Sequence, residues 1–418
     1  MSDQCNPEKM SINSDHQSKL LGLAPLMRQA FSDVDLKPLG SSLITRVREV
    51  PDDANALMDL ATVLLLIGQR DTALTMQMEA LKLQPLYAIP SVHKTKIKLL
   101  ALMTVGDLMA NTPLEFLLED SDIALSLLYV GEGIPALPAI PEHDVVFVAV
   151  GEADEKHALL EDLQEIVQLW PKPVINFPAR IRQLGRDNAF KLLQAADGVE
   201  MPMSIRIDRA TLDQLGRGEL DITELLDGDN FPIIVRPLGS HAGQGLRKLT
   251  GLDAIPDYLQ AVPSAEFYVA RFVDYRSQDG QFRKYRIILI DGQPFISHMG
   301  ISKHWMIHYL NAGMADSAEK RDEEKHFMEH FDTDFTPRHT AAFKEIYERL
   351  GLDYVGIDCG ETQDGKLLIF EVDSDMIVHA MDPVDLFPYK QAPMKKLFSA
   401  FRDLLVKKAS CAIPPQDI

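Results

Sequence analysis

Apolar positions near the start of the chain predict a flexible tail followed by a helical region. Residues 1–16 carry almost no large apolar side chains, so they cannot offset the entropy cost of becoming ordered. Between Pro51 and Pro85 the apolar positions repeat with helical spacing on both sides of Gly68, which predicts a helical hairpin. Because one hairpin cannot bury its own apolar faces, we expect residues 17–50 to add flanking helices.

Strands alternate with helices between about residues 94 and 180. Such alternation is typical of a small parallel sheet covered by helices, with ligand sites beyond the carboxyl ends of the strands. The turn at 105–107 would lie at such an end, although a plain connecting loop explains it equally well. Short apolar runs predict the strands 97–104, 124–130 and 144–150, and helices are expected at 114–118 and 157–170.

After residue 186 the pattern predicts two α+β lobes. The first has strands at 203–208, 232–238, 246–250 and 266–273, with helices at 209–226 and 252–262. The second has a strand-rich block at 284–302, a charged helical stretch at 317–350 and strands at 354–359 and 366–373. We therefore expect five segments: a tail at 1–16, a helical domain at 17–92, a small sheet domain at 93–200, a first lobe at 201–275 and a second lobe at 276–418.

The composition is that of an ordinary globular protein, and it narrows the possible functions. The chain has 418 residues, 46% of them hydrophobic and 25% charged, and a formal charge of −20. This acidity disfavours nucleic acid and anionic membrane surfaces as partners. Apolar patches such as 64–67 fall short of the roughly 20 residues of a membrane span, and residues 1–10 lack the apolar core of a signal peptide. Three scattered cysteines predict no disulfide framework, so we expect a cytoplasmic protein.

A glycine-rich segment follows the predicted strand at 232–238. This strand delivers Arg236 and Pro237, and three glycines lie within the seven residues Gly239–Gly245. Glycines permit positive φ angles and bring backbone N–H groups close to an anion, as in phosphate-binding loops. A tight hairpin also needs glycine, so the segment alone leaves both interpretations open.

Three carboxylates end two predicted strands near the C-terminus. Asp358 ends one strand, and Glu371 and Asp373 stand two apart on the next, so the last two share a face. Apolar flanking residues would bury that face, where unpaired acids are costly unless a cation neutralises them. Carboxylate oxygens suit Mg²⁺, which is normally bound through a few carboxylates and the phosphates of a nucleotide. The alternative is an exposed hairpin with solvated acids.

The glycine-rich hairpin, the basic residues Arg283, Lys284 and Arg286, and the late acidic triad together resemble the ATP-grasp superfamily. The motifs are most similar to those of carboxylate–amine ligases, such as glutathione synthetase and the glutamate ligase that extends a ribosomal protein. The resemblance covers about residues 97–385. It implies a small parallel-sheet domain followed by two lobes that clamp ATP, with two Mg²⁺ or Mn²⁺ ions.

The resemblance also implies roles for matching residues. Arg236 would contact nucleotide phosphate, Arg286 a phosphate or acyl phosphate, and the hinge 270–273 the adenine. The metal ligands would be Asp358, Glu371 and Asp373, and the catalytic residues Arg286 and Lys303. The expected nucleotide-binding residues are Lys191, Arg236, Gly239, Ser240, His241, Ala242, Gly243, Gln244, Gly245, Ala270, Arg271, Phe272, Val273, Lys284, His308 and Asn311.

Several of these positions depart from the family pattern. Arginine at 236 keeps the charge of the usual lysine and can grip phosphate with two N–H groups. Lys191, one turn from Asn188, is expected to replace a phosphate-binding lysine of the preceding helix. The other departures are Arg271 in place of glutamate, Lys284 in place of aspartate and Asp373 in place of asparagine.

The segment 299–314 is unusually rich in lysine, histidine and aromatic residues. It supplies further candidates for nucleotide or acceptor contacts, and His379 just beyond the triad is another. A structural role explains any single histidine equally well. The candidates in the segment are Lys303, His304, His308, Tyr309 and Asn311.

The helical hairpin at 51–85 resembles a tetratricopeptide repeat, except that Gln77 stands at a large aromatic position. Two interpretations remain open: a cap that stabilises the fold, or a platform that docks a protein partner.

The resemblance implies an ATP-dependent ligase that joins a carboxylate to an amine through an acyl phosphate. Its substrates would be small carboxylates and amines, or a peptide or protein, and the sequence does not identify them. The alternatives are an ATP-grasp phosphotransferase and a non-catalytic nucleotide-binding scaffold that recruits partners through its helices.

Overall fold

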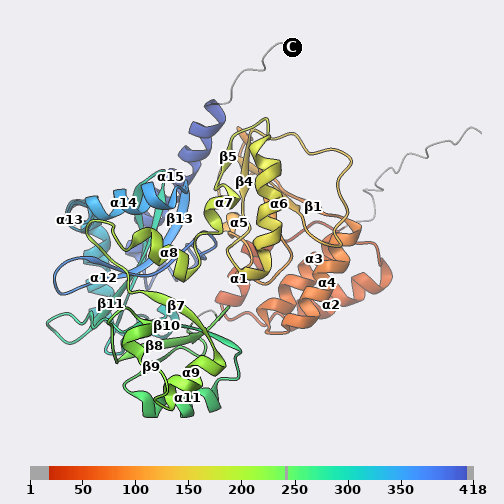
Figure 1. Ribbon diagram of the computed structural model, residues 1–418. Coiled ribbons are helices and arrows are strands. Elements are labelled where there is room, and N and C mark those ends of the chain that lie inside the picture. Colours follow the sequence, from red (N-terminus) through yellow and green to blue (C-terminus); the bar gives the residue numbers. More distant parts are fainter. Residues whose placement is uncertain (1–17, 241–242, 412–418) are drawn as a thin grey trace, which may run out of the picture.

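The computed structural model describes residues 18–240 and 243–411, so the predicted tail at 1–16 lies outside the described residues. The described chain begins with a bundle of helices, drawn in red and orange in Figure 1. Asp53 starts the third helix, because its side chain accepts a hydrogen bond from the Ala56 N–H. The helical hairpin and its flanking helices thus lie where the spacing predicts them, while the tetratricopeptide resemblance stays a prediction. The helices are α1 (Leu23–Phe31), α2 (Lys37–Glu49), α3 (Ala54–Leu66) and α4 (Arg70–Leu83).

The N-terminal sheet comes next, with strand order β1-β3-β2-β4-β5. Strand β1 runs antiparallel to β3, whereas the other pairs are parallel. The expected parallel sheet is therefore a mixed one, because the chain enters it through an edge strand. Its strands are β1 (Leu86–Ile89), β2 (Ile97–Met103), β3 (Ile123–Tyr129), β4 (Val145–Val148) and β5 (Val174–Ile175), and its neighbouring helices are α5 (Leu114–Leu117), α6 (His157–Gln168) and α7 (Pro178–Ile181).

Alternate residues of the N-terminal sheet face two different layers. Leu100 and Leu102 pack in one cluster with Leu160 and Leu163 of α6. The opposite face packs against the bundle and against α15 (Gln391–Ser410), which bears Phe401. Both faces are buried, which explains why these strands are apolar runs rather than alternating patterns.

The middle sheet is antiparallel, with strand order β7-β10-β8-β9. It has a separate core, in which Ile233 and Val235 of β8 pack against Tyr258 of α11. Its strands are β7 (Ser204–Asp208), β8 (Ile233–Pro237), β9 (Arg247–Leu249) and β10 (Glu266–Arg271), with η2 (Leu252–Ala254) and the helices α9 (Arg209–Gly216), α10 (Ile222–Leu225) and α11 (Ile255–Ala261).

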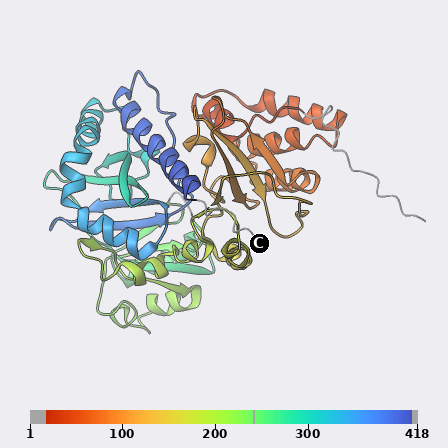
Figure 2. The same ribbon diagram turned by 90° about the horizontal axis from the view of Figure 1, so that it is seen from above.

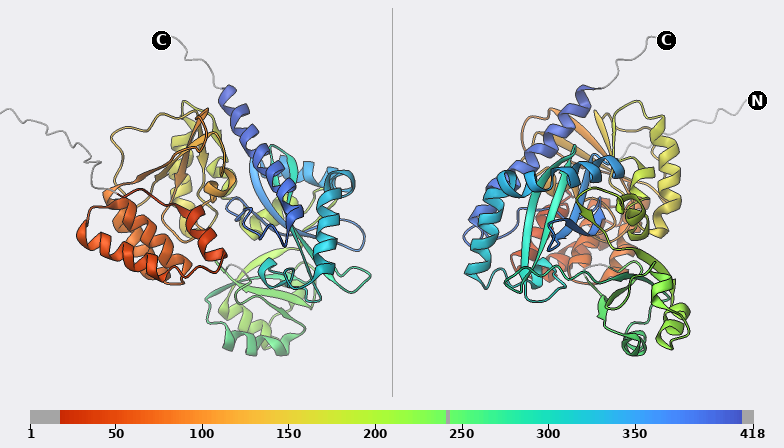
Figure 3. Two further views of the ribbon diagram at one scale, coloured as in Figure 1. Left: turned by 180° about the vertical axis from the view of Figure 1, so that it is seen from behind. Right: turned by 60° about the vertical axis from the view of Figure 1, so that its left-hand side comes forward.

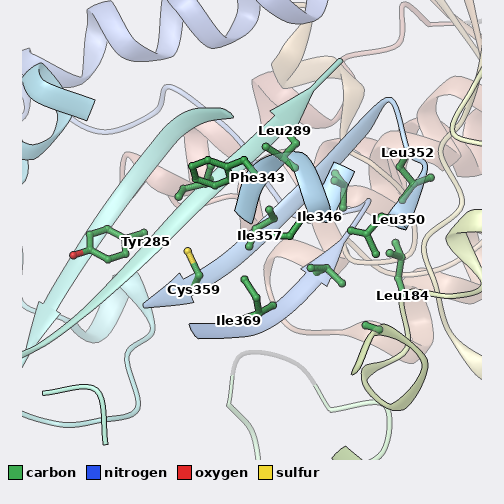
Figure 4. Close-up of a cluster of buried hydrophobic side chains, with 14 of the residues drawn as sticks. Leu184, Tyr285, Leu289, Phe343, Ile346, Leu350, Leu352, Ile357, Cys359 and Ile369 are labelled. Atoms are coloured by element: carbon green, nitrogen blue, oxygen red, sulfur yellow. The ribbon is translucent and has the colours of Figure 1, made fainter. Parts of the chain in front are cut away.

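The C-terminal sheet has the strand order β12-β11-β13-β14-β6. Its short strand β6 (Val199–Glu200) pairs in parallel with β14, although the sequence places residues 199–200 in the preceding domain. Phe343 and Ile346 of α14 cover one face of this sheet, as Figure 4 shows. The other strands are β11 (Phe282–Ile290), β12 (Gln293–Ser302), β13 (Tyr354–Glu361) and β14 (Leu367–Asp373).

The charged stretch at 317–350 is helical, as predicted, but it is interrupted by the π turn η4 (Phe331–Phe335). The pieces are α12 (Ala318–His330), α13 (Thr336–Arg338) and α14 (Thr340–Leu350); the remaining short elements are η1 (Asp154–Lys156), α8 (Arg186–Leu193), η3 (Tyr309–Asn311) and η5 (Pro388–Lys390).

The C-terminal helix α15 was not predicted, and it joins two parts of the molecule. Figure 2 shows this dark-blue helix between the orange N-terminal sheet and the blue C-terminal sheet. Arg402 holds it to the loop before β3 with two hydrogen bonds of 2.7 Å to Asp122. Among the described residues, we find no helix that combines the length and the apolar character of a membrane span.

Candidate active site

A cavity of ≈ 420 Å³ lies where the middle and C-terminal sheets meet, and α1 and α8 also reach it. Strands β8 and β10 contribute from one side, and β11, β13 and β14 from the other. Most of the predicted site residues on these strands line this one space, which we call the cavity.

Besides Arg271 of the predicted hinge, four positively charged side chains line the cavity: Arg186, Arg236, Lys284 and Arg286. Lys284 and Arg286 stand two apart on β11, so strand geometry turns both to the same face. Arg236 comes from the end of β8, and Arg186 is the first residue of α8. A polyphosphate is the kind of ligand that such a group of cations can neutralise.

Asp358 faces two of these cations across the C-terminal sheet. The strand register sets it directly opposite Arg286 of β11 and Glu371 of β14. Arg286 donates hydrogen bonds of 2.8 and 2.9 Å to its two oxygens, and Lys284 Nζ lies 2.6 Å from Oδ2. Burial opposes the charged form of Asp358, but the two cations outweigh it and hold its pKa well below the usual range.

Glu371 is held by Arg186, a residue that the sequence analysis missed. The Arg186 guanidinium donates hydrogen bonds of 2.5 Å to both the Glu371 carboxylate and the Phe370 carbonyl. Burial opposes ionisation of Glu371, yet Arg186 and Arg236 together lower its pKa. Burial and repulsion from Arg186 in turn lower the pKa of Arg236 to about 10. The cations here are crowded, which favours binding of additional negative charge.

Asp373 differs from the other two carboxylates, because its nearest polar neighbour is another acid. Burial raises its pKa, and the pKa of the adjacent Asp375 lies well above the ordinary value through burial and the charge of Asp373. Asp375 Oδ1 is buried without a hydrogen-bond partner. The backbone of Gly151 lies against Asp375, since a Cβ there would stand 1.7 Å from Oδ2.

The expectation that three carboxylates converge on one point needs a correction. Asp358, Glu371 and Asp373 line the same cavity, but Asp358 already binds two cations. Within the described ranges, the group of three possible ligands whose atoms all lie within 4.8 Å is a different one, Glu152, Asp154 and His157. Asp358 and Glu371 each pair with their own basic residues, whereas Asp373 lies beside Asp375.

The donor set nevertheless fits a hard divalent cation at Glu371 and Asp373. Both offer carboxylate oxygens on one face of β14, and the orphaned oxygen of Asp375 lies next to them. Asp373 and Asp375 are buried acids with raised pKa values, so added positive charge would stabilise their ionised forms. Asp358 could also bind this cation only if one of its contacts with Lys284 or Arg286 were broken.

The glycine-rich segment adjoins the cavity. Gly245 has a φ of 68°, and a Cβ there would stand 2.7 Å from Pro237 Cγ, so a larger residue would clash. Gly243 lines the cavity and faces Met306 of the opposite loop. Arg236 donates hydrogen bonds to Ser240, one of them 3.3 Å from Nε to Oγ. His241 and Ala242 lie outside the described residues, Gly239 and Gln244 are exposed, and Ser240 is half-buried.

The predicted hinge forms an aromatic slot at one side of the cavity. Ala270, Arg271, Phe272 and Val273 all line it. Lys248 Nζ lies 3.5 Å from the centre of the Phe272 ring, and Trp305 packs edge-on against that ring at 5.6 Å. Arg271 is engaged by Glu200 and by Asp229 at 3.1 Å, so it is tied to protein carboxylates.

Two predicted lysines do not lie where they were expected. Lys303 is exposed and stands outside the set of residues that line the cavity, so a catalytic contact is not supported. Lys191 is also outside that set; its side chain is 65% exposed and lies 3.9 Å from Asp187. Arg186, five residues earlier on the same helix, lines the cavity instead.

The segment 299–314 is divided in the same way. His308 and Tyr309 line the cavity, and burial lowers the pKa of His308. His304 is exposed, and Asn311 is exposed as well but caps the segment by accepting a hydrogen bond of 3.1 Å from the His308 N–H. Trp305, His308 and Tyr309 of this segment thus reach the cavity, whereas Lys303 and His304 do not.

Two further groups near the cavity have perturbed environments. His298, opposite Arg286 in the strand register, was missed; burial and the charges of Arg286 and Lys390 hold its pKa well below the usual range. His379 lines the cavity as predicted, and burial lowers its pKa to about 4. Period-two alternation along β12 could have identified His298.

A buried lysine supports the wall behind His298. Lys390 is 2% exposed and lies 3.4 Å from Glu324 and 3.1 Å from Asp382. Its ammonium also stands 4.1 Å from the centre of the Tyr309 ring. These contacts fix Tyr309, and through it the edge of the cavity.

Comparisons with known proteins give fold similarities only. No protein-family model and no curated protein matches the sequence. Among solved structures, the chain is similar to VanG D-Ala:D-Ser ligase from Enterococcus faecalis, at 16% identity over 76% of this chain and 100% of that one, with a TM-score of 0.45.

Two other solved structures have comparable similarity. One is a RimK domain ATP-grasp protein from Sphaerobacter thermophilus, at 16% identity over 74% and 99% of the two chains, with a TM-score of 0.43. The other is a D-alanine–D-alanine ligase from Bacillus anthracis complexed with ATP, at 13% identity over 75% and 97%, with a TM-score of 0.42. Similarity at this level does not assign a function, which has to come from the cavity itself.

Proposed function

We propose that the protein is an ATP-dependent ligase that joins a carboxylate to an amine through an acyl phosphate. The observation that carries the proposal is the convergence of lysine, arginine and carboxylate side chains on one cavity with an aromatic slot beside them. A nucleotide triphosphate has the complementary chemistry: a flat base and a chain of negative charges. A substrate carboxylate would add one more charge.

Each part of the cavity has a role in this proposal. Phe272 in the aromatic slot would contact the base, and Arg186 and Arg236 would bind phosphate oxygens. The backbone N–H groups around Gly243 would approach the terminal phosphates. Electrostatic positioning of this kind is the main source of catalysis in phosphoryl transfer.

Glu371 and Asp373 are the residues that would hold Mg²⁺ or Mn²⁺. Such a cation would neutralise charge on the transferring phosphoryl group. Asp358 would act mainly by holding Arg286 and Lys284 in place, because it binds both.

The proposed reaction has two steps. A carboxylate oxygen of the substrate attacks the γ-phosphorus, the bond to the bridging oxygen breaks, and ADP leaves with that electron pair. The amine nitrogen then attacks the acyl carbon, inorganic phosphate leaves and the amine loses a proton to solvent. Arg286 and Lys284 would stabilise the negative charge on the phosphoryl and acyl oxygens in both steps.

One observation favours a second candidate, a non-catalytic nucleotide-binding scaffold. Both oxygens of Asp358 are occupied by Arg286 and Lys284, so that carboxylate is less free to bind a metal than the family pattern implies.

Hydroxylamine trapping separates the candidates. The protein is incubated with Mg·ATP, hydroxylamine and a panel of amino acids and short peptides, and ADP and hydroxamate are both measured. A ligase is expected to release one ADP for each molecule of hydroxamate or amide formed, and none of these products should form without the metal. ADP without hydroxamate would indicate a phosphotransferase instead, and the absence of both products would favour the scaffold.

A further inference from the structure

Helix α1 has two apolar faces, and only one of them faces the rest of the bundle. Leu26 and Ala30 pack in the bundle core with residues of α2 and α3. Leu23, Met27 and Phe31 recur at a spacing of four, so they form a second stripe along the helix. That stripe packs against Phe116, Ile377 and Met381, far away in sequence.

The second stripe reaches the cavity. Met27 and Phe31 are among its lining residues, and they are the contribution of the helical region to it. Figure 3 shows α1 in red, projecting from the bundle toward the blue C-terminal part of the chain. The helical region is thus neither a remote cap nor only a platform, because it forms part of the cavity wall.

Two carboxylates hold α1 in this position. Asp59 accepts hydrogen bonds of 2.8 and 3.1 Å from the N–H groups of Leu21 and Gly22, just before the helix. Glu115 of the neighbouring α5 accepts one of 3.0 Å from the Ala24 N–H. These bonds satisfy orphan donors at the helix start, and they fix the helix axis relative to the N-terminal sheet.

The wall formed by α1 lies close to the proposed reacting centre. Phe31 packs edge-on against His379, with ring centres 5.2 Å apart. The same loop is tied to the basic residues, since Arg286 donates a hydrogen bond of 3.3 Å to the Ile377 carbonyl. We call this part of the cavity the apolar end; its lining residues are Met27, Phe31, Met109, Met376 and Ile377.

We propose that α1 determines substrate specificity, with Phe31 and Met27 forming a pocket for the apolar side chain of an amino acid or a peptide terminus. This proposal rests on the ligase function proposed above. A charged side chain would lose hydration among the apolar side chains of this end. Thioether and aromatic groups pack well against aliphatic and aromatic side chains.

The test compares ADP release by variants of α1 with pairs of L-amino acids. The pairs are drawn from glycine, alanine, leucine, phenylalanine, glutamate and lysine, supplied with saturating Mg·ATP. Wild-type protein is expected to favour pairs that contain leucine or phenylalanine. Phe31→Ala is expected to lower kcat/KM for those pairs roughly 10- to 100-fold, because the substrate side chain loses apolar contacts with the pocket. The KM of Phe31→Ala for ATP should change less than about two-fold, since the proposed nucleotide site is at the aromatic slot and the basic residues.

Two variants control for indirect effects. Phe31→Leu keeps an apolar group and should retain most of the preference. Arg28→Met lies on the same helix and breaks the ion pair with Glu119, but Arg28 is not a cavity residue, so the preference should be unchanged. Equal losses in Arg28→Met and Phe31→Ala would mean that α1 acts only by stabilising the fold.

The outcomes separate this proposal from the proposed function. If Mg·ATP fails to stabilise the wild-type protein, the proposed ligase function is wrong. If Mg·ATP binds but no pair is preferred for its apolar side chain, or if Phe31→Ala keeps the wild-type preference, the specificity proposal is overturned while nucleotide binding stands.

Discussion

The two ends of the cavity are built in different ways. The basic end is the part of the cavity lined by Arg186, Arg236, Lys284, Arg286, Asp358, Glu371 and Asp373. These residues lie mainly on strands, where register sets each partner: Asp358 stands opposite Arg286 and opposite Glu371. The apolar end is built from α1 and the loop after β14, whose positions follow from side-chain packing. Register is a rigid, local consequence of strand pairing, whereas the apolar end depends on contacts between segments far apart in sequence.

The largest expected effect is at the basic end. Arg286→Met should lower turnover about 10²- to 10³-fold, because it removes a positioned donor to the transferring groups. It should also cost about 3–5 kcal/mol of unfolding free energy, since Asp358 loses its bidentate partner in a buried place. Steady-state kinetics and denaturant unfolding measure the two effects.

Arg283→Met is the matched control on the same strand. Arg283 pairs with Asp279 and Glu323 away from the cavity, so turnover should stay near the wild-type value. The double variant Arg286→Met/Asp358→Asn should recover stability without recovering turnover. Normal turnover in Arg286→Met would remove that residue from the proposed chemistry.

A pH titration should sharpen the comparison, because the acid that anchors α1 and Asp358 at the basic end have oppositely shifted pKa values. Burial raises the pKa of Glu115, which anchors α1, from 4.5 to about 7, whereas the pKa of Asp358 lies well below its usual range. The folded state thus binds the Glu115 proton more tightly than the unfolded state. The stability contributed by this group is complete below pH 4.5 and is lost as the pH rises through about 7.

The expected size is up to about 3 kcal/mol between pH 5 and pH 8, from 1.36 kcal/mol per pKa unit. Glu115→Gln should flatten this dependence of unfolding free energy on pH, as measured by denaturant titration at each pH. Parallel curves for the variant and the wild type would show that Glu115 ionises normally in the folded protein.

Phe272→Ala tests the aromatic slot. Loss of the ring should weaken ATP binding roughly ten-fold, since stacking on an aromatic side chain contributes about 1–3 kcal/mol per base. The preference among amino acids should be unchanged in Phe272→Ala, whereas Phe31→Ala should change it. Calorimetric titration with a non-hydrolysable ATP analogue measures the affinity. A changed amino-acid preference with unchanged ATP affinity in Phe272→Ala would reverse the assignment of the two ends.

The smallest effect is expected at Lys191. Its side chain is mostly exposed, so Lys191→Ala should change ATP affinity less than about two-fold. Arg186→Ala, one turn away on α8, should weaken it at least about ten-fold, because a phosphate-facing charge is lost. A stronger effect of Lys191→Ala than of Arg186→Ala would restore the sequence-based assignment.

Periodicity predicted most strands and the shared face of the basic end. The pairs Lys284 with Arg286 and Glu371 with Asp373 stand two apart on strands, and all four residues line the cavity. Short β6 escaped detection, because two residues carry no periodic signal. The helix α15 could have been found, since Met394, Leu397, Phe401 and Leu404 follow helical spacing and are buried.

The rest of the site depends on packing that no local pattern encodes. Lys191 and Arg186 lie on the same short helix, and only the angle of that helix decides which of them faces the phosphate side. The sequence predicts only that Phe31 lies in the region of flanking helices at 17–50. It reaches the cavity because α1 contacts both the bundle and the loop after β14.

The most direct test of the account is thermal unfolding with and without Mg·ATP. If Arg186, Arg236, Glu371 and Asp373 together bind the nucleotide and its metal, Mg·ATP at 100 times its Kd should add about 2.7 kcal/mol of stability. The unfolding midpoint with Mg·ATP should then lie clearly above the midpoints with Mg²⁺ alone and with AMP alone. At the same ATP concentration, a ten-fold weaker affinity in Arg186→Ala should remove about half of the added stability. Coincident unfolding curves for the wild-type protein with and without Mg·ATP would contradict the account.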